Sequence, residues 1–373
     1  MFGSADIFTG SSSSAYRSPP ISINVCTGYT IDISISRFRR AELLDGVPII
    51  YCGKEAIKNR GVCNLVWPVQ EGMIKDWDEM EKLWHHIFYR ELQVPPETAR
   101  VLHTVHPLVQ REDQEKMTEL LFETFTLHGL YLAKSPALSM YASGRTSGVV
   151  WENGYECSYV APVFEGFQLK HSTVITPITG KVLTNRLQTL MLNMGYSFTT
   201  PYEIDLLNEI KQNICYVAQD YENELAETSN FMDAKVKYKL PDGQHIMLGA
   251  ERFQVAEALF QTGLEPDCKS KNLIDSIIAS IDLCDLDYRK MFFNNIVFCG
   301  GSTLFPGLVE RVKRDLTFKL KSISPVIDAM ELRQYAAWAG GSMMASMVHM
   351  KDFWLSKEEY EDSGTERVVY KFY

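Results

Sequence analysis

Apolar residues recur at helical spacing over much of the chain. In residues 77–92 the apolar side chains fall on one stripe of a helix, formed by Met80, Trp84, Ile87 and Phe88, and Asp76 precedes it as a plausible cap. We expect this stripe to pack into a core rather than to contact a ligand. Similar patterns predict helices over 111–125, 135–144, 183–194, 202–219, 270–283 and 340–348.

Two stretches of the chain share one plan of strand, turn and strand. Residues 21–35 turn at Thr27-Gly28, and residues 149–163 turn at Asn153-Gly154, a pair that predicts a two-residue hairpin. Each hairpin opens one half of the chain, so we expect two related α/β domains. Residues 1–20 are rich in serine and end in Pro-Pro, which is typical of a flexible tail.

A glycine turn lies between an apolar run and an amphipathic segment in residues 295–314. The run at 296–299 leads into Gly300-Gly301-Ser302-Thr303, and Pro306 is expected at the first position of the following helix. Such a turn lets a ligand approach bare backbone at the positive end of a helix. A tight strand-to-helix connection without a ligand is the alternative.

Composition limits the classes of function. A net charge of −10 over 373 residues argues against a broad nucleic-acid surface, and no apolar run is long enough to predict a membrane span. The N-terminus lacks the pattern of a signal peptide. The eight cysteines include no C-x-x-C pair, which favours reduced thiols in a cytosolic or nuclear protein. His85 and His86 point to different faces of a helix, so we expect no metal site there.

Several segments resemble the actin family, in the family's order. They are WDEMEKLWHHIFYREL at 77–92, EKMTELLFETF at 115–125, SMYASGRTSGVV at 139–150, KLPDGQ at 239–244, GGSTLFPGLVERVKRDL at 300–316 and WAGGSMMASM at 338–347. The likeness runs from about Gly53 to Phe372. It implies an α/β actin-like fold of two duplicated ribonuclease H-like domains around a central cleft. The first domain would comprise residues 21–134 and 339–373, with one shortened subdomain, and the second residues 135–338.

The resemblance also implies an ATP site with a divalent cation between the two hairpin loops. The positions that match the family's nucleotide-binding residues are Thr27, Gly28, Gly154, Lys211, Gly301, Ser302, Leu304 and Phe305. The positions that depart from it are Asn24, Ile31, Ser135, Glu152, Tyr155, Glu156, Tyr159, Gln212 and Gln334. In particular, Asn24 replaces a carboxylate, Ser135 a water-orienting glutamine, and Tyr159 a histidine that helps to position water.

These departures lead us to expect no catalytic or metal-ligating residues. A glutamate carboxylate at 156, placed about 4 Å from a phosphate charge, would cost roughly 4 kcal/mol at an effective dielectric constant near 20. Each lost water-positioning group removes on the order of 10²–10⁴ in rate. We therefore expect no cofactor, or ATP or ADP bound weakly or in an altered way, and no enzymatic activity. In the alternative, the loops merely close a packed cleft.

The contacts of a filament subunit are retained on one side only. The stretch between Gly28 and Gly53 is shorter than in actins, and charged residues replace an apolar plug around 264–271. The residues that keep an apolar lining for a partner groove are Tyr141, Gly144, Thr146, Met343, Met344 and Met347. Internal packing is the alternative for the methionines.

The expectation from the sequence is a divergent actin-related protein in the cytoplasm and cytoskeleton. It would be a non-catalytic structural subunit that terminates or binds one end of an actin-like polymer. Its partners would be actin-like subunits or cytoskeletal assembly proteins, without direct nucleic-acid contact. The alternatives are an ATP-hydrolysing, filament-forming actin and a nuclear chromatin-remodelling subunit.

Overall fold

The computed structural model describes residues 8–9, 35–38, 49–52, 56, 64–230, 235–241, 243–264, 271–321 and 323–372. The first expected hairpin, with Asn24, Thr27, Gly28 and Ile31, lies outside these residues, and so does most of the expected tail. Residues 265–270 of the replaced plug also lie outside them. The predicted division of the chain into residues 21–134 with 339–373 and 135–338 stays a prediction.

The first of two main sheets has the strand order β1-β7-β8-β17. Its strands are β1 (Phe8–Thr9), β7 (Arg100–Val105), β8 (Gly129–Lys134) and β17 (Leu355–Ser356). The two central strands are parallel, and both edge strands run antiparallel to their neighbours. A core that includes Trp84, Phe88 and Leu121 joins this sheet to the helices beside it. These helices are α2 (Trp77–His86), α3 (Arg111–Glu123), α13 (Lys357–Ser363) and α14 (Arg367–Lys371).

The second main sheet has the order β11-β10-β9-β15-β16, and β12 also pairs with β10. The strands are β9 (Gly148–Asn153), β10 (Ser158–Phe164), β11 (Phe167–Gln168), β12 (Val174–Ile175), β15 (Ile296–Cys299) and β16 (Ile327–Asp328). Its helices are α5 (Gly180–Asn193), α6 (Pro201–Ile214), α7 (Tyr221–Asn230), α8 (Glu251–Glu257), α9 (Leu273–Asp282), α10 (Leu286–Phe293) and α11 (Leu308–Leu320). The mixed α/β fold expected from the sequence is confirmed.

Smaller elements complete the two halves. The short strands are β2 (Ile35–Phe38), β3 (Ile49–Cys52), β4 (Asn64–Val66), β5 (Val69–Gln70), β6 (Met73–Ile74), β13 (Val236–Lys239) and β14 (His245–Leu248). The short helices are η1 (Ile87–Leu92), η2 (Pro96–Thr98), η3 (Lys170–Ser172), η5 (Gly301–Leu304), η6 (Arg333–Tyr335) and η7 (Val348–Asp352). No helix in the described ranges is long and apolar enough to cross a bilayer.

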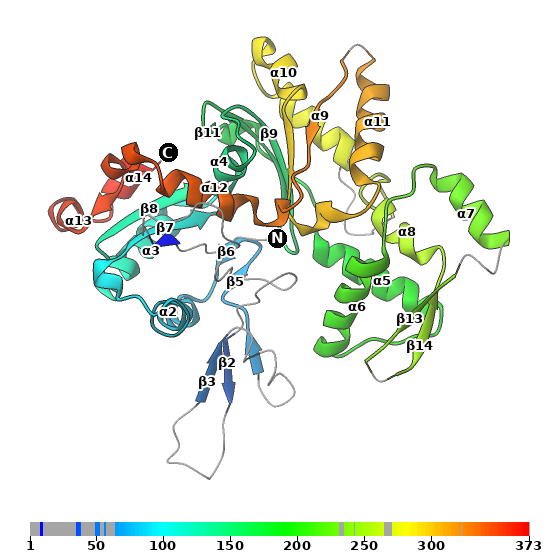
Figure 1. Ribbon diagram of the computed structural model, residues 1–373, viewed down its shortest axis with the longest axis horizontal. Helices are drawn as coiled ribbons and strands as arrows, with labels where there is room; N and C mark the ends of the chain where they lie inside the picture. The colour runs from blue at the N-terminus through cyan, green and yellow to red at the C-terminus, as the bar shows by residue number, and fades with distance from the viewer. Residues whose placement is uncertain are drawn as a thin grey trace.

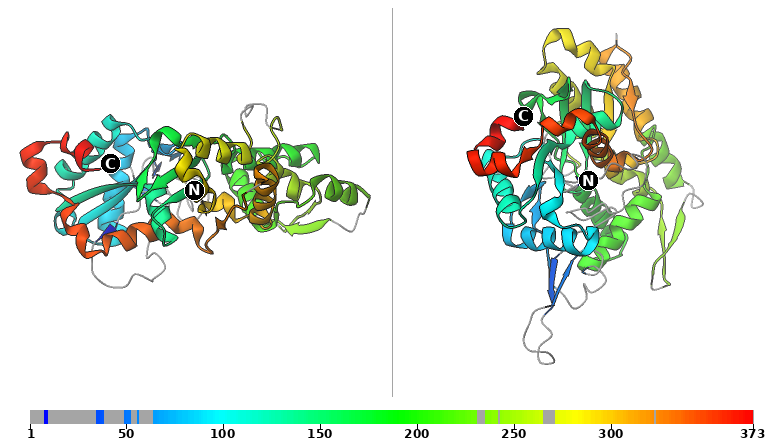
Figure 2. Two further views of the ribbon diagram at one scale, coloured as in Figure 1. Left: turned by 90° about the horizontal axis from the view of Figure 1, so that it is seen from above. Right: turned by 60° about the vertical axis from the view of Figure 1, so that its left-hand side comes forward.

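Two helices pack together where the halves meet. They are α4 (Ser135–Ala142) and α12 (Ala336–Ala345), which lie side by side between the two main sheets (Figure 1). A methyl group added at Gly340 would lie 1.7 Å from the carbonyl oxygen of Leu138, so the backbones touch almost directly. Seen from above, the molecule is elongated, with the C-terminal helices at one end and the α7 region at the other (Figure 2).

Local hydrogen bonds explain why several helices begin or end away from their expected limits. Asp76 accepts the backbone N–H of Glu79 at 3.0 Å and caps α2 as predicted. Thr179 accepts the N–H of Val182 at 3.4 Å, so α5 begins before residue 183. Cys215 is extended and ends α6 before residue 219. The helix expected from Gly340 begins at Ala336.

Two turn predictions are wrong. Asn153 pairs with Ser158 across the β9–β10 hairpin, so residues 154 to 157 form the connection instead of a two-residue turn. Pro306 does not open α11. Its carbonyl oxygen accepts the N–H of Val217 at 2.9 Å, and Gly307, at φ +81°, precedes the first helical residue, Leu308. Tertiary contacts therefore overrode both local signals.

Candidate functional site

The β9–β10 connection, residues 154–157, packs against the start of α5 and the glycine turn, and its Tyr155 and Cys157 also belong to the core of the first sheet. The carbonyl oxygen of Gly154 accepts the N–H of Gly180, at the start of α5, at 2.5 Å. The same oxygen accepts the Ser302 hydroxyl at 3.3 Å, from η5. The N–H of Lys181 donates to the carbonyl oxygen of Tyr155 at 2.6 Å. The structure thus brings three of the predicted nucleotide positions, Gly154, Gly301 and Ser302, together with the N-terminus of α5.

Two glycines allow this close packing. A methyl group at Gly180 would lie 2.7 Å from Ser302 Oγ and 2.8 Å from the carbonyl oxygen of Gly154. A methyl group at Gly300, which has φ +94°, would lie 2.3 Å from the carbonyl oxygen of Asn153. The space freed by both missing side chains is occupied by protein atoms. These glycines therefore support a tight strand-to-helix connection as well as they would support contact with a ligand.

Three residues that depart from the family pattern form one buried cluster, which we call the 152 cluster. Glu152 Oε2 accepts the Ser135 hydroxyl at 2.7 Å and the Tyr159 hydroxyl at 2.6 Å. All three residues are buried, with exposed fractions of 7%, 7% and 2% for Glu152, Ser135 and Tyr159. Two neutral donors thus satisfy the carboxyl group in the interior.

Burial dominates the electrostatics of the 152 cluster. Desolvation raises the pKa of Glu152, while the hydrogen bonds from Tyr159 and Ser135 act in the opposite direction. Desolvation and the nearby Glu152 raise the pKa of Tyr159 well above its usual value, so it remains a hydroxyl donor. A magnesium ion prefers ionised carboxylates and water in octahedral geometry. A desolvated carboxyl group already bound by two hydroxyls does not fit that role.

Glu156 departs from the expectation that its charge would face a phosphate. Its Oε1 forms an ion pair with Lys181 Nζ at 2.9 Å, and its Oε2 accepts the N–H of Glu71 at 3.1 Å. Glu71 lies in the turn between β5 and β6, so this carboxylate links the two halves of the molecule. Because Lys181 neutralises it, the repulsion calculated for an unpaired Glu156 is too large.

Lys211 is buried in α6 and bound to protein groups. Its Nζ donates to the carbonyl oxygen of Gly180 at 2.7 Å and to Thr184 Oγ1 at 2.8 Å. Desolvation lowers its pKa to about 7. The ring of Tyr155 lies 5.8 Å from the ammonium nitrogen. The residues predicted to contact the base and ribose are therefore close together, but their polar groups already have partners in this region.

Arg333 of η6 binds the glycine turn through two hydrogen bonds to Thr303. Its guanidinium donates to the carbonyl oxygen of Thr303 at 2.9 Å and to Thr303 Oγ1 at 3.0 Å. Leu304 is half-buried, and Phe305 packs into the core of the second sheet. Gln212 and Gln334 are half-buried on α6 and η6. Among the residues placed by the structure, the amide oxygen and nitrogen of buried Asn153 have no hydrogen-bond partner.

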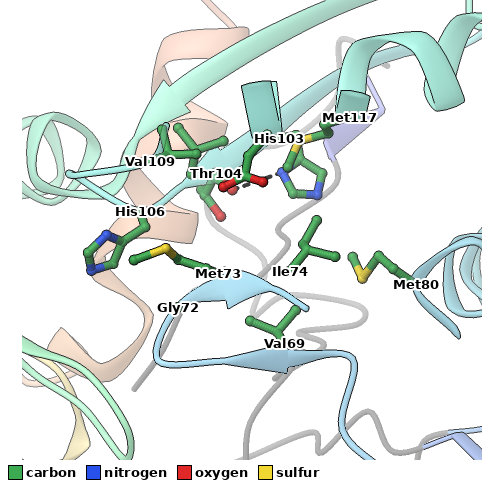
Figure 3. A pocket seen from close by; sticks show the side chains of 12 residues that line it. Val69, Gly72, Met73, Ile74, Met80, His103, Thr104, His106, Val109 and Met117 are labelled. Carbon is green, nitrogen blue, oxygen red and sulfur yellow. Dashed lines mark hydrogen bonds between the residues drawn. The ribbon is translucent and has the colours of Figure 1, made fainter. Parts of the chain in front are cut away.

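Sequence reasoning missed two histidines beside the 152 cluster. They line a small cavity of about 30 Å³ together with Gly72, Met80 and Met117, at the end of β7 (Figure 3). His103 Nδ1 bonds to the carbonyl oxygen of Thr104 at 2.8 Å, and the ring of His106 meets that of Tyr159 edge-on at 5.6 Å. Burial lowers the pKa of each histidine to about 4. The sequence signal that could have identified them is their spacing, because His103 lies in the predicted strand at 101–104 and His106 follows just beyond it.

The residues predicted to line a partner groove lie on α4 and α12 and just beyond the C-terminal end of each helix. Tyr141 and Met344 are half-buried and pack against the cluster around Leu138, so internal packing applies to part of the set. Gly144 and Thr146 are exposed, Met343 is half-buried, and Met347 is 53% exposed. Val348, which follows in the chain, is 75% exposed. An apolar, solvent-accessible edge therefore remains at the C-terminal end of α12.

Residues 18–373 match the family model described as Actin. The match covers almost the whole chain and includes the docked 154–157 connection and the glycine turn. In the described part of the site, however, the residues do not fit a magnesium-bound triphosphate, because Glu152, Glu156 and Lys211 are each held by other protein groups.

Proposed function

The chain belongs to the actin family, and from this premise we propose that it is a non-catalytic structural subunit of a cytoskeletal assembly. It joins or terminates one end of an actin-like polymer. Its partners are actin-like subunits or cytoskeletal assembly proteins, and its place is the cytoplasm and cytoskeleton.

The observation that carries the proposal is the 152 cluster. Hydrolysis of ATP needs a carboxylate to hold the cation and polar groups to orient the attacking water. Ser135 and Tyr159 instead donate their hydroxyl hydrogens to Glu152 at 2.7 and 2.6 Å. A hydroxyl with its hydrogen committed to a buried carboxyl group is a poor guide for a water molecule. Two water-positioning roles and one metal-binding role are thereby lost together.

The groove supports the structural role. Exposed apolar side chains at the end of α12 suit the apolar face of a partner helix, which such grooves bind through a few anchoring residues. Met347 is a flexible, polarizable contact residue of the kind that adapts to a partner surface. Together with the shortened stretch between Gly28 and Gly53, this favours a subunit that binds at one end only.

The decisive test measures phosphate release from Mg-ATP by the full-length protein with a malachite-green assay. We expect release at the level of the protein-free blank when the protein is alone, and at the level of the filaments alone when actin filaments are added. Release above the blank that is abolished by Glu152→Gln would contradict the proposal and favour an active ATPase.

The structural role is tested by filament growth. We expect the protein to slow elongation at one end of labelled actin filaments when growth at each end is imaged separately. Met347→Glu should remove this effect, whereas Leu192→Glu, at an exposed leucine on α5, should retain it. Equal elongation at both ends with and without the protein would refute end binding.

A further inference from the structure

An open pocket of about 650 Å³ gathers basic side chains from α3, β8 and η3. Its basic residues are Arg111 at the start of α3, Lys134 at the end of β8 and Lys170 in η3. Phe167 from β11 and Phe372 near the C-terminus provide the aromatic part of the wall. The chain as a whole carries a charge of −10, so this local excess of positive charge opposes the general trend.

Two of the three cations are unpaired. In the ranges that the structure covers, neither Lys134 nor Lys170 has a carboxylate within ion-pair distance, whereas Arg111 pairs with Glu115 at 2.6 Å. Lys134 is half-buried, and desolvation, followed by repulsion from Lys170, lowers its pKa. Two ammonium groups that repel each other across a pocket gain interaction energy when an anion enters between them.

The helix α3 begins at the pocket, and its residues Arg111 and Gln114 line the wall. Gln110 precedes α3, and its side chain does not cap the helix. The Gln110 amide instead donates to the carbonyl oxygen of Leu108 at 3.2 Å. Free N–H groups and the helix dipole favour negative charge at such ends. Glu112 and Asp113 in the first turn of α3 reduce this effect, so the lysines are the stronger contribution.

From this arrangement we propose that the pocket between α3, β8 and η3 binds a phosphate group, with Lys134 and Lys170 as its principal contacts. The ring of Phe167 is 60% exposed beside them, which suits the aromatic part of an aryl phosphate ester. The site is distinct from the 152 cluster, although Lys134 directly precedes Ser135 in the chain. Lys170 and Phe167 belong to elements that do not form the 152 cluster.

The test is calorimetric titration of the full-length protein with inorganic phosphate and, separately, with phenyl phosphate. We expect saturable binding at one site for each. Lys134→Gln and Lys170→Gln should each weaken it at least about tenfold, because each removes a charge-assisted hydrogen bond. The matched control is Lys313→Gln, an exposed lysine on α11, which should leave the affinity unchanged.

The two ligands distinguish the source of the phosphate group. Tighter binding of phenyl phosphate that is lost in Phe167→Ala assigns the site to an aryl ester, and equal binding assigns it to free phosphate. Absence of binding by both ligands would overturn the proposal. So would binding that survives the double variant Lys134→Gln/Lys170→Gln, or that Lys313→Gln weakens as much as the pocket variants do. Unfolding curves of each variant show whether the fold is intact, and exposed Lys170 is the change least able to disturb it.

Discussion

The two ends of α4 face different surroundings. At its start, Ser135 donates to Glu152 in a buried, fully paired group of polar residues. Near its end, half-buried Tyr141 lies in the groove region beside α12, whose C-terminal edge exposes Met347 and Val348. At the start of α4 the polar side chains of Ser135, Glu152 and Tyr159 are thus bound to one another, while apolar surface is exposed at Met347 and Val348.

In the proposed function, this difference lets an actin-family fold serve as a docking scaffold. The helix pair α4 and α12 is tightly packed, so both regions keep their positions. At one end of α4, the side chains of Ser135, Glu152 and Tyr159 bind one another. The contrast predicts that substitutions in the shared helix pair and the cleft affect folding, whereas those on the groove edge affect only association.

The largest effect on stability is expected from a substitution that separates α4 from α12, because both the buried end and the exposed end of α4 depend on this helix pair. Gly340→Ala should lower the free energy of unfolding by about 3 kcal/mol, because the added methyl group meets the Leu138 carbonyl at 1.7 Å and the backbones must move apart. Urea denaturation measures this. Gly249→Ala is the matched control, since its methyl group would meet its nearest neighbours only at 3.5 Å. Equal stability of both variants would show that the two helices separate easily.

The cleft side should also respond to pH through His103 and His106. Their pKa of about 4 in the folded chain lies below the ordinary 6.5, so the unfolded chain binds more protons between these values. Protonation therefore favours the unfolded chain. The free energy of unfolding is unaffected by these histidines above pH 6.5 and falls by roughly 3 kcal/mol for each histidine as the pH decreases towards 4.

The measurement is the free energy of unfolding of wild type and His103→Leu at pH 8 and pH 5. At pH 8 the difference between them reports packing and the lost hydrogen bond to the Thr104 carbonyl oxygen, without a contribution from protonation. We expect the variant to lose less stability than wild type on going to pH 5. Parallel losses in the two proteins would mean that His103 accepts a proton in the folded state as readily as in the unfolded state.

A smaller effect is expected from removal of one donor in the 152 cluster. Tyr159→Phe should cost about 2 kcal/mol, because Glu152 then keeps only the Ser135 hydroxyl in a buried setting. The control is Tyr238→Phe, at a half-buried tyrosine packed against the core of the second sheet. Thermal or chemical unfolding of both variants compares them. A loss below that of Tyr238→Phe would indicate that water replaces the missing hydroxyl.

The smallest change in stability is expected at the groove edge. Met347→Ser should alter the free energy of unfolding by no more than about 0.5 kcal/mol, because the side chain is exposed in the isolated protein. Met344→Ser should cost more, since Met344 packs against the cluster around Leu138. If the two variants lose equal stability, Met347 is part of the core and the contrast between cleft and groove weakens.

Much of the fold could be predicted from local patterns. The stripe of Met80, Trp84, Ile87 and Phe88 is buried as expected, and Asp76 caps its helix. The prediction that Pro306 opens a helix is wrong because its carbonyl oxygen accepts the N–H of Val217, a residue distant in the sequence. Helix limits shifted for similar reasons, since caps and carbonyl partners depend on which segments meet.

The site was harder to predict than the fold. The residues that depart from the family pattern could be named one by one, but their mutual bonding could not. Glu156 lies 25 residues from Lys181 and 85 from Glu71, so no local spacing reveals that its charge is neutralised. The same holds for Ser135, Glu152 and Tyr159, which satisfy one another only after the strands and α4 have assembled.

The mutual bonding of these three residues has an evolutionary consequence. A substitution at Glu152 leaves both hydroxyls without their acceptor, and one at Ser135 or Tyr159 leaves Glu152 with a single donor in the interior, where an unpaired group is costly. Replacement of this set by another would therefore require coordinated changes, each harmful alone. Such epistasis favours retention of the three residues together.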